Sequence, residues 1–591
     1  MWRRTYLLLL FVRIYFALSP SYLHPDEVFQ GPEIIAGSVL GYPSRKTWEW
    51  TSSAPIRSLF PLWPVYGLPV LLLQWLGPRD SNGDVGPATV YYTLRFVMFM
   101  ISFVLEDWAI HELVHSPRYR SQAVVLIASS YVTWTFQTHT FSNSVDTLAV
   151  LWSLALIERI VGEQVVAGPP DRVNLADVLI SSQKRSSIGS SLVLGFLLVF
   201  GTFNRLTFPA FVVIPGLRLL PHFWNRPFCL VAVLLSAIFW TWVAVATDTV
   251  YYTGPEASES VRALLTHLSK TPIITPLNNL RYNSQTGNLA QHGLHPRYQH
   301  LLANLPQLLG PALPALLSTL YPFTLANLKL RLSNPRLISA ATSIAILSIA
   351  PHQEPRFLLP CVPLLLTCVS LPPSGPLVTA FWTSWIVFNT LLGALMGVYH
   401  QGGIIPSVLS LPSLIPPALN ATNSNAHNIE VFYWKTYPPP THLLGSPPPR
   451  NCRTDQSLNI SMVPLMGVAQ SEVVFMLMQH FPTCDPGLVD YISPHPVPTE
   501  VFVAAPLSAW RLPFDHDGDD TATKPPRLLD PSDPSFSIHF PDQRAALGMR
   551  SLHVWRKHLN LDDLDVGGEG VWRTVQRVWG RRGLAVWKSA D

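Results

Sequence analysis

Charged residues are scarce in this sequence. Only 13% of the 591 residues are Asp, Glu, Lys or Arg, whereas an ordinary soluble domain carries about 25%. Because 48% of the chain is hydrophobic, the composition predicts an integral membrane protein. The net charge of +4 is spread without a basic block, so nothing indicates a nucleic acid partner.

Cysteine is also scarce, and the five cysteines follow no metal-binding spacing. Cys229, Cys361 and Cys368 lie in apolar runs, where we expect them to be small buried side chains. Cys452 and Cys484 lie in the polar C-terminal part of the chain. A disulfide in an oxidising lumen and two free thiols are both compatible with that position.

Several common catalytic motifs are missing. The sequence has no P-loop, no G-x-S-x-G and no H-E-x-x-H, which excludes soluble nucleotide hydrolysis and common hydrolase chemistry. The acidic run 515–520 resembles a calcium loop, but Asp520 stands where glycine is needed and Pro526 where a bidentate glutamate is needed. We interpret it as a solvated acidic turn.

The first apolar segment, residues 6–18, follows Arg3 and Arg4. The positive-inside tendency therefore predicts a cytosolic N-terminus. A cleaved signal peptide is the alternative, but Arg13 interrupts the apolar core and no A-x-A-like cleavage site follows.

Further apolar segments follow along the chain, at 90–114, 123–136, 145–160, 191–203, 208–220, 228–246, 305–321, 337–350, 358–371 and 377–398. The segment 62–76 contains Pro64 and Pro69, which favours a bent or re-entrant structure over a continuous span. If the connectors rich in Lys and Arg are cytosolic, the charge pattern predicts about eleven spans.

This orientation places four polar connectors on the same membrane face as the loop that follows the first span. They are residues 138–144, the turn at Asn204 and Arg205, the loop 248–304, and residues 352–357. One face of the membrane is therefore expected to hold most of the chemistry.

The loop 19–61 contains an acidic motif, His24-Pro25-Asp26-Glu27. Adjacent carboxylates at a helix exit can serve as a general base, ligate a metal or cap the next helix, and Asp before an apolar run is an ordinary N-cap. The same loop carries Arg57, further acids and several aromatic residues. Such groups beside a bilayer suit a substrate that is part lipid and part sugar.

A second cluster, in loop 248–304, holds His292, His295 and His300 within nine residues. The spacing follows no zinc template, and Pro296 breaks the helix that would align the imidazoles, so we disfavour a metal site. Arg281 and Arg297 are better candidates for binding a phosphate, because a guanidinium offers paired donors. A solvated loop is the alternative.

His352, Glu354 and Arg356 form a third group between two apolar segments, where charged residues are costly and usually functional. An ion pair between Glu354 and Arg356 that holds a helix end is the structural alternative. The two interpretations are compatible with each other.

Residues 1–400 are predicted to form the multi-spanning domain, and residues 401–591 a small mixed or β-containing domain on the non-cytosolic face. The second part is polar and proline-rich, with alternating apolar stretches. Asn420 and Asn459 match the glycosylation acceptor pattern, which suits that face.

Taken in order, the motifs resemble those of glycosyltransferase family 22. The likeness rests on residues 24–33, on Thr47-Trp48-Glu49-Trp50, on residues 140–144, and on His352-Gln353-Glu354-Pro355-Arg356-Phe357. Within the family, residues 288–298 and 432–440 are most similar to the branch that adds a fourth mannose to the glycosylphosphatidylinositol (GPI) precursor.

The resemblance implies a GT-C fold: an all-α polytopic protein of the endoplasmic reticulum membrane with long luminal loops, 19–61 and 248–304, and a small mixed luminal domain. It also implies dolichyl-phosphate mannose as donor and a GPI precursor glycolipid as acceptor. The donor mannose is β-linked and the product an α-1,2-mannoside, so the reaction would be one inverting displacement.

The resemblance further implies roles for residues. Asp26 would be the general base for the acceptor hydroxyl, with Glu27 orienting the acceptor or sharing that role. Arginines and histidines would stabilise charge on the departing lipid phosphate, so no metal or other cofactor is required. The candidate substrate-binding residues are His24, Arg57, Arg281, His292, His295, Arg297, His352, Glu354 and Arg356.

Two other functions remain open from the sequence. One is a sister activity of the same family, adding the third GPI mannose or a mannose of the dolichol-linked oligosaccharide. The other is a lipid or sugar transporter. Transporters often have two similar halves, and the acidic loop at Asp26 has no counterpart in the second half.

Overall fold

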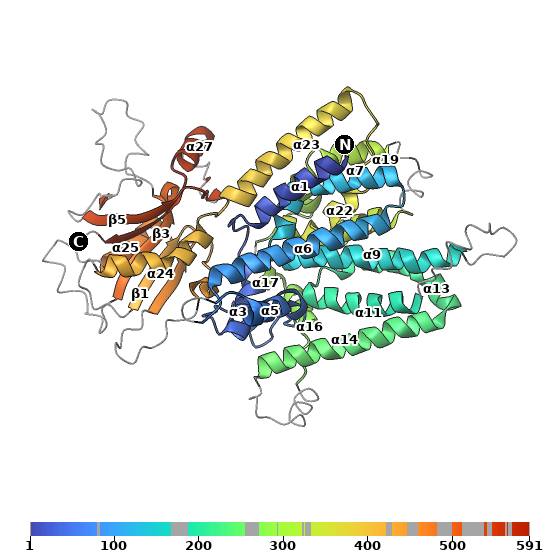
Figure 1. Ribbon diagram of the computed structural model, residues 1–591, viewed down its shortest axis with the longest axis horizontal. Helices are drawn as coiled ribbons and strands as arrows, with labels where there is room; N and C mark the ends of the chain where they lie inside the picture. Colours follow the sequence, from blue (N-terminus) through green and yellow to red (C-terminus); the bar gives the residue numbers. More distant parts are fainter. Residues whose placement is uncertain are drawn as a thin grey trace. The chain divides into compact units, whose positions relative to one another are not determined.

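A computed structural model describes residues 2–79, 83–166, 187–254, 271–291, 293–321, 324, 333–420, 428–445, 459–480, 499–510, 537–539, 546–561, 564 and 570–589. The chain forms two compact units (Figure 1). The helical unit comprises Met1–Ala17, Lys46–Pro69 and Leu94–Leu392. The sheet unit comprises Leu18–Arg45, Val70–Thr93 and Gly393–Asp591.

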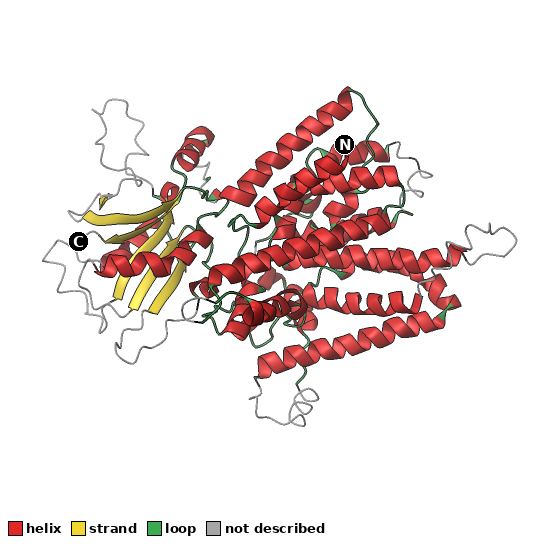
Figure 2. Cartoon of the chain, in the orientation of Figure 1, coloured by secondary structure: helices red, strands yellow, loops and turns green. Residues whose placement is uncertain are grey.

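The helical unit consists of helices and short helical turns (Figure 2). Its longer helices are α1 (Trp2–Ala17), α6 (Pro87–Leu113, which begins in the sheet unit), α7 (Pro117–Ala128), α9 (Ser142–Val166), α11 (Ser187–Asn204), α14 (Pro227–Thr253), α21 (Pro335–Leu347) and α23 (Pro376–Ala394). Its shorter elements are α4 (Trp48–Thr51), η1 (Trp63–Gly67), α8 (Tyr131–Trp134), η2 (Phe136–Thr138), α12 (Pro209–Gly216), η4 (Leu217–Leu219), α13 (Leu220–Asn225), α16 (Thr275–Asn283), α17 (Thr286–Ala290), η5 (His300–Asn304), α18 (Leu305–Leu309), α19 (Ala312–Leu320), η6 (Pro355–Leu358) and α22 (Cys361–Leu366).

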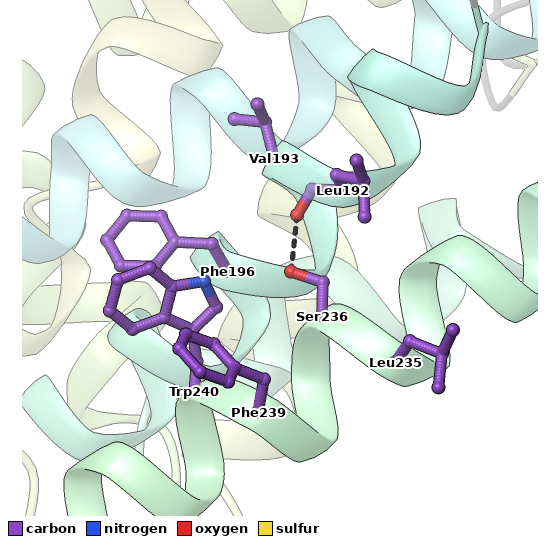
Figure 3. Close-up of a pocket in the computed structure, with 7 residues that line it drawn as sticks. All are labelled: Leu192, Val193, Phe196, Leu235, Ser236, Phe239 and Trp240. Carbon is purple, nitrogen blue, oxygen red and sulfur yellow. Dashed lines mark hydrogen bonds between the residues drawn. The ribbon is translucent and has the colours of Figure 1, made fainter.

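Helices α11 and α14 pack closely because glycine stands at their contact. A Cβ at Gly195 would lie 2.6 Å from the carbonyl oxygen of Val233, so only a residue without a side chain permits this approach. Ser236 donates a hydrogen bond across the pair to the Leu192 carbonyl, at 2.7 Å (Figure 3). A shallow groove of about 560 Å³ lies beside this contact and is lined mainly by apolar side chains. Such a lining is typical of a surface that faces acyl chains.

Four helices among the described residues are long and apolar enough to cross a membrane: Pro87–Leu113, Ser187–Asn204, Pro227–Thr253 and Pro376–Tyr399. A fifth candidate is the pair His300–Leu309 and Ala312–Thr319, which is bent by 110°. The bend has a local cause, because Gly310 adopts φ +48° and a Cβ there would lie 2.5 Å from the Phe388 ring. The chain is therefore a multi-pass membrane protein.

These helices are fewer than the roughly eleven spans that charge and hydropathy predict. The apolar segments 62–76, 337–350 and 358–371 form shorter helices or turns, Trp63–Leu76, Pro335–Leu347 and Cys361–Leu366. Proline accounts for part of the difference, since it removes a backbone donor and favours breaks between helical pieces.

The sheet unit contains a six-stranded mixed sheet in the order β2-β1-β3-β6-β5-β4. Strand β1 pairs in parallel with β2 and β3, and the remaining neighbours pair antiparallel. The strands are β1 (Asn428–Trp434), β2 (Asn459–Leu465), β3 (Thr499–Pro506), β4 (Ser537–His539), β5 (Ala546–Trp555) and β6 (Leu584–Ser589). The prediction of a mixed sheet in the C-terminal part of the chain is confirmed.

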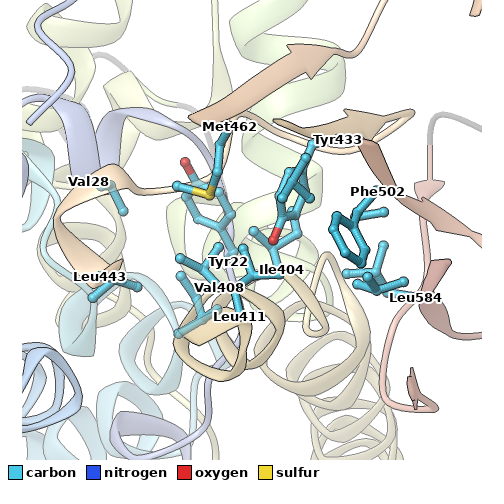
Figure 4. Close-up of a cluster of buried hydrophobic side chains, with 14 of the residues drawn as sticks. Tyr22, Val28, Ile404, Val408, Leu411, Tyr433, Leu443, Met462, Phe502 and Leu584 are labelled. Carbon is cyan, nitrogen blue, oxygen red and sulfur yellow. The ribbon is translucent and has the colours of Figure 1, made fainter. Parts of the chain in front are cut away.

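Alternating side chains of β1 give the sheet two buried faces. Phe432 and Trp434 join one apolar cluster, which includes residues of α25 (Gln470–His480). Val431 and Tyr433 join the other, which includes residues of α24 (Ile404–Asn420) (Figure 4). The sheet unit also contains α3 (Pro32–Leu40), α5 (Leu68–Leu76, which begins in the helical unit), η7 (Leu395–Tyr399), η8 (Thr441–Leu444), η10 (Leu507–Ala509) and α27 (Val571–Gly580).

Helix α2 (Asp26–Phe29) belongs to the second of these faces. Val28 and Phe29 are buried in the cluster with α24 and the sheet. The N-terminal acidic motif is therefore held on the sheet by its own apolar residues.

Candidate active site

The acidic motif begins a short helix but does not cap it. Pro25 occupies the N-cap position of α2, with no side-chain cap hydrogen bond, and Asp26 is the first helical residue. The next helix, α3, has Gly31 at its N-cap. The capping role weighed from the sequence is therefore wrong for Asp26.

The Asp26 carboxylate is held by neighbouring side chains and remains partly exposed. Its carboxylate accepts a hydrogen bond from the Gln30 amide, one turn along the chain, and His24 Nδ1 lies 3.2 Å from Asp26 Oδ1. The Asp26 side chain is 20% exposed, whereas Glu27 is only 2% exposed. Of the two adjacent carboxylates, Asp26 is the one that a substrate can reach.

Tyr437, from the C-terminal part of the chain, packs against aromatic rings at and near this motif. The Tyr437 ring lies 5.7 Å from Tyr22, 6.0 Å from His24 and 5.5 Å from His400, measured between ring centroids. The Tyr22 hydroxyl donates to the Pro438 carbonyl at 3.1 Å. Burial, and then the charge of Glu27, raise the pKa of Tyr22, so this tyrosine stays a neutral hydrogen-bond donor.

Glu33 is a fully buried carboxylate that joins two distant parts of the chain. It accepts hydrogen bonds from the Arg45 amide at 2.8 Å, from the Thr441 amide and hydroxyl, and from the His442 amide and Nδ1. Burial by itself would raise the pKa of Glu33, but His442 and these hydrogen bonds outweigh it and lower the pKa. The carboxylate therefore ties α3 to η8.

A second group lies in the helical unit, at the turn 352–357. His352 donates from Nε2 to Glu354 at 2.8 Å and from Nδ1 to the Gly293 carbonyl at 3.1 Å. Arg356 forms an ion pair with the same carboxylate. The hydrogen bond to Glu354 raises the pKa of His352, which favours the imidazolium that both donated hydrogen bonds require.

This turn is fixed to the histidine-rich loop. The His295 amide donates to the Pro351 carbonyl at 2.8 Å, and the Gln353 amide donates to His295 Nδ1 at 3.3 Å. The Gln353 side chain accepts a hydrogen bond from the His300 amide at 2.9 Å. Residues about sixty positions apart are thus brought together, as the shared-face prediction requires.

Two further predicted connectors meet the same turn. Asn143 donates to the Arg356 carbonyl at 3.0 Å and accepts from Arg205 at 3.1 Å. The guanidinium carbons of Arg205 and Arg356 lie 5.4 and 5.9 Å from the centre of the Phe357 ring. Two arginines of the helical unit, Arg205 and Arg356, therefore lie near the same phenylalanine ring.

The remaining site predictions have different outcomes. Arg57 forms an ion pair with Glu49, at 2.7 Å. Arg281 lies on α16 and Arg297 follows Pro296, and both are exposed. His292 lies outside the described residues, as do Cys452 and Cys484.

The glycosylation acceptors fall at element ends: Asn420 ends α24 and Asn459 begins β2. Their glycosylation stays a prediction. Among the described residues, Cys229 and Cys361 are buried free thiols, as expected, whereas Cys368 is a free thiol that is only partly buried.

Among the described residues, no three His, Cys, Asp or Glu side chains are placed to hold a metal ion together. The expectation of a reaction without a metal stays a prediction, to be tested by chelation.

Sequence reasoning missed several residues that build these groups. Glu33 had no assigned role, although it lies in residues 24–33, which carry the family resemblance. Arg205 was recognised only as part of a polar connector, and Asp248 was not considered. Asp248 is buried and accepts hydrogen bonds from Ser58 at 3.0 Å and Thr275 at 2.8 Å, which fixes the loop after α4. A carboxylate two residues after the apolar segment 228–246 was the available signal.

Comparison with known proteins gives the family. Residues 4–444 match the model of the Alg9-like mannosyltransferase family. A protein of Aspergillus oryzae named GPI mannosyltransferase 4 is 48% identical over 600 aligned positions, covering 100% of this chain and 99% of the relative. The Saccharomyces cerevisiae protein of the same name is 36% identical, covering 73% of this chain and 74% of its own length.

Among solved structures, ArnT from Cupriavidus metallidurans bound to undecaprenyl phosphate aligns with a TM-score of 0.39 and 14% identity, over 72% of this chain and 66% of ArnT. The family match, the apolar helices and the mixed sheet confirm the predicted GT-C class and the resemblance to family 22. This chain therefore belongs to the Alg9-like mannosyltransferase family.

Proposed function

We propose that this protein transfers mannose from dolichyl-phosphate mannose to the third mannose of the GPI precursor, in an α-1,2 linkage, on the luminal side of the endoplasmic reticulum membrane. The observation that carries the proposal is identity of 48% along the whole chain to a protein named GPI mannosyltransferase 4. The family match to mannosyltransferases supports it.

Asp26 is the general base of this reaction. The acceptor 2-hydroxyl loses its proton to Asp26 as its oxygen forms a bond to the anomeric carbon of the donor. The bond from that carbon to the phosphate oxygen breaks, its electron pair leaves with dolichyl phosphate, and the configuration inverts. The 20% exposure of the Asp26 side chain and its hydrogen bond from Gln30 support this role.

Glu27, which is buried, orients the motif rather than receiving the proton. Its charge acts on Tyr22, one of the residues packed against Tyr437. Because Glu27 is buried, Asp26 is the accessible carboxylate of this adjacent pair.

The cations of the helical unit stabilise the leaving phosphate. His352 and Arg356 share Glu354, and Arg205 lies over the same Phe357 ring as Arg356. Two guanidinium groups and an imidazolium face two carboxylates, because Asp146 acts on Arg205 as Glu354 does on His352 and Arg356. The three cations exceed these two acids by one, and this positive charge suits a phosphate. His295 supports the turn through the Gln353 amide.

The test is an assay of membranes that contain the full chain, supplied with labelled dolichyl-phosphate mannose and a three-mannose GPI acceptor. We expect a four-mannose product whose new residue is released by an α-1,2-mannosidase. Asp26→Asn should abolish transfer while the protein stays folded in the membrane. Glu472→Gln, an exposed carboxylate on α25, is the matched control and should retain transfer.

Three other results would contradict parts of this proposal. Full transfer by Asp26→Asn would refute the general base. Accumulation of a glycolipid shorter than the three-mannose form in depleted cells, or of a truncated dolichol-linked oligosaccharide, would refute the acceptor and support a sister activity. Movement of the lipid without a new glycosidic bond would support a transporter.

A further inference from the structure

Helix α27 presents an apolar face that is exposed in the part of the chain that the structure describes. Val571, Trp572, Val575 and Trp579 are 63%, 72%, 42% and 53% exposed. They fall on one arc of the helix, because Val571, Val575 and Trp579 recur every four residues and Trp572 precedes Trp579 by seven residues, which is about two turns. A soluble surface rarely exposes two tryptophans in one patch, so the face fits a binding partner.

The other side of α27 is attached to the sheet unit. Thr574 and Val578 are buried, and Arg577 donates to the Ser508 carbonyl in η10 at 2.6 Å. The orientation of the helix is therefore set by the fold, and its exposed tryptophans are not a consequence of a loosely attached segment.

Charge flanks the apolar face. Residues 571–582 contain four arginines but no Asp or Glu. Arg577 is engaged with the Ser508 carbonyl, whereas Arg573 is exposed. The Arg582 guanidinium lies 5.6 Å from the centre of the Trp579 ring. Basic side chains beside exposed tryptophans are the pattern of a helix that lies in the headgroup layer, with its rings at the acyl boundary and its guanidinium groups at lipid phosphates.

The fold places this helix beside the end of an apolar span. The Trp579 ring lies 5.9 Å from the ring of Tyr399, the last residue of the candidate span Pro376–Tyr399. Two backbone hydrogen bonds fix the connection: the Leu559 amide donates to the Tyr399 carbonyl at 2.8 Å, and the Gln401 amide donates to the Leu559 carbonyl at 3.1 Å. Aromatic residues at span ends mark the membrane–water boundary.

We propose that α27 is a membrane-interface anchor, which inserts Val571, Trp572, Val575 and Trp579 into the bilayer surface at the end of the span that terminates at Tyr399. The occupant is the phospholipid headgroup layer, with phosphates bound by Arg573 and Arg582. The anchor holds the C-terminal sheet on the membrane that the chain spans, and it is independent of the transfer reaction.

The experiment uses the full chain reconstituted in nanodiscs of phosphatidylcholine and phosphatidylserine with a photoactivatable phospholipid. After illumination, peptide mass spectrometry locates the lipid adducts. We expect adducts on residues 571–579 and on α23. Helix α25 is the internal control, because Phe475 is 63% exposed there without a flanking cluster of arginines, and it should remain unlabelled.

A variant with Trp572→Ser and Val575→Ser should lose the adducts on α27 while those on α23 persist. Both side chains are exposed, so the thermal transition of the chain should be unchanged. Replacing phosphatidylserine by phosphatidylcholine should reduce labelling of α27 more than that of α23.

Labelling of α27 no greater than that of α25, in discs where α23 is labelled, would overturn the proposal. A dimer in the discs that dissociates in the serine variant would also overturn it, by assigning the face to a second copy. Neither result would affect the proposed mannosyl transfer, which is measured separately.

Discussion

Replacing Glu33 by glutamine tests whether its carboxylate joins the acidic motif to the C-terminal part of the chain. The side chain keeps its size but loses its charge, and one of its two ends becomes an NH2 group, which donates hydrogen bonds and cannot accept them. The amide would face either the Arg45 and Thr441 donors or the His442 donors. At least one buried donor is then left without an acceptor.

The expected loss of folding free energy is large because Glu33 and His442 are fully buried. Breaking a buried, hydrogen-bonded ion pair by removing one partner costs about 3–5 kcal/mol. In a unit of about 250 residues, each kcal/mol lowers the melting temperature by about 2–4 °C. We therefore expect the sheet unit to melt about 10 °C lower in Glu33→Gln at pH 7.

The assay is the thermal transition of the full chain in detergent, followed by tryptophan fluorescence as pH is lowered. The pKa of Glu33 is lowered by folding, so its contribution to stability is complete above the unfolded value, about 4.3, and is lost as pH falls through the folded value. The difference between wild type and Glu33→Gln should shrink in that acid range. Glu472→Gln, on the exposed side of α25, should melt like wild type.

Two results would refute this reasoning. An unchanged transition at pH 7 would show that the carboxylate does not join α3 to η8. A difference that persists undiminished at acid pH would show that the charge of Glu33 is not the cause.

Three further predictions follow from other parts of the chain. His352→Gln should flatten the pH dependence of stability above about pH 6.5. The pKa of His352 is raised in the folded protein, so its stabilisation is complete below the unfolded pKa and is lost as pH rises through the folded pKa. Equal pH profiles for the variant and wild type would contradict this. Gly310→Ala should lower the melting temperature, since φ +48° and the contact with Phe388 add strain of about 1–3 kcal/mol, whereas Gly216→Ala, with open space around it, should not; equal melting temperatures would argue against the strain. Chelation of divalent cations with EDTA should leave mannosyl transfer unchanged, and loss of transfer restored by a metal would disprove the expected direct reaction.

Prediction from the sequence was most successful where one local pattern carries the information. Low charge with long apolar runs indicated a membrane protein, and the alternating stretches after residue 400 indicated the mixed sheet domain. The number of about eleven spans stays a prediction, because only four helices among the described residues are long and apolar enough to cross a membrane by themselves. Hydropathy averages over a window, so it does not register a break such as the one at Gly310, where one positive φ turns a helix by 110°.

In the candidate site, too, the sequence indicated the residue types but not their exposure. The sequence identified Asp26, Glu27 and the turn 352–357, because charged residues beside apolar segments are unusual. It did not distinguish the two acids, since adjacent residues differ in exposure only after α2 packs on the sheet through Val28 and Phe29.

The sequence by itself determined the class of this protein, its family and the residue types available for catalysis, because composition and ordered motifs are properties of the chain. The tertiary structure alone decided which partners those residues have. Glu33 meets His442 across about four hundred residues, and Arg205 and Arg356 meet at Phe357. Such pairings depend on how helices and strands pack, and no local pattern encodes a partner so far away.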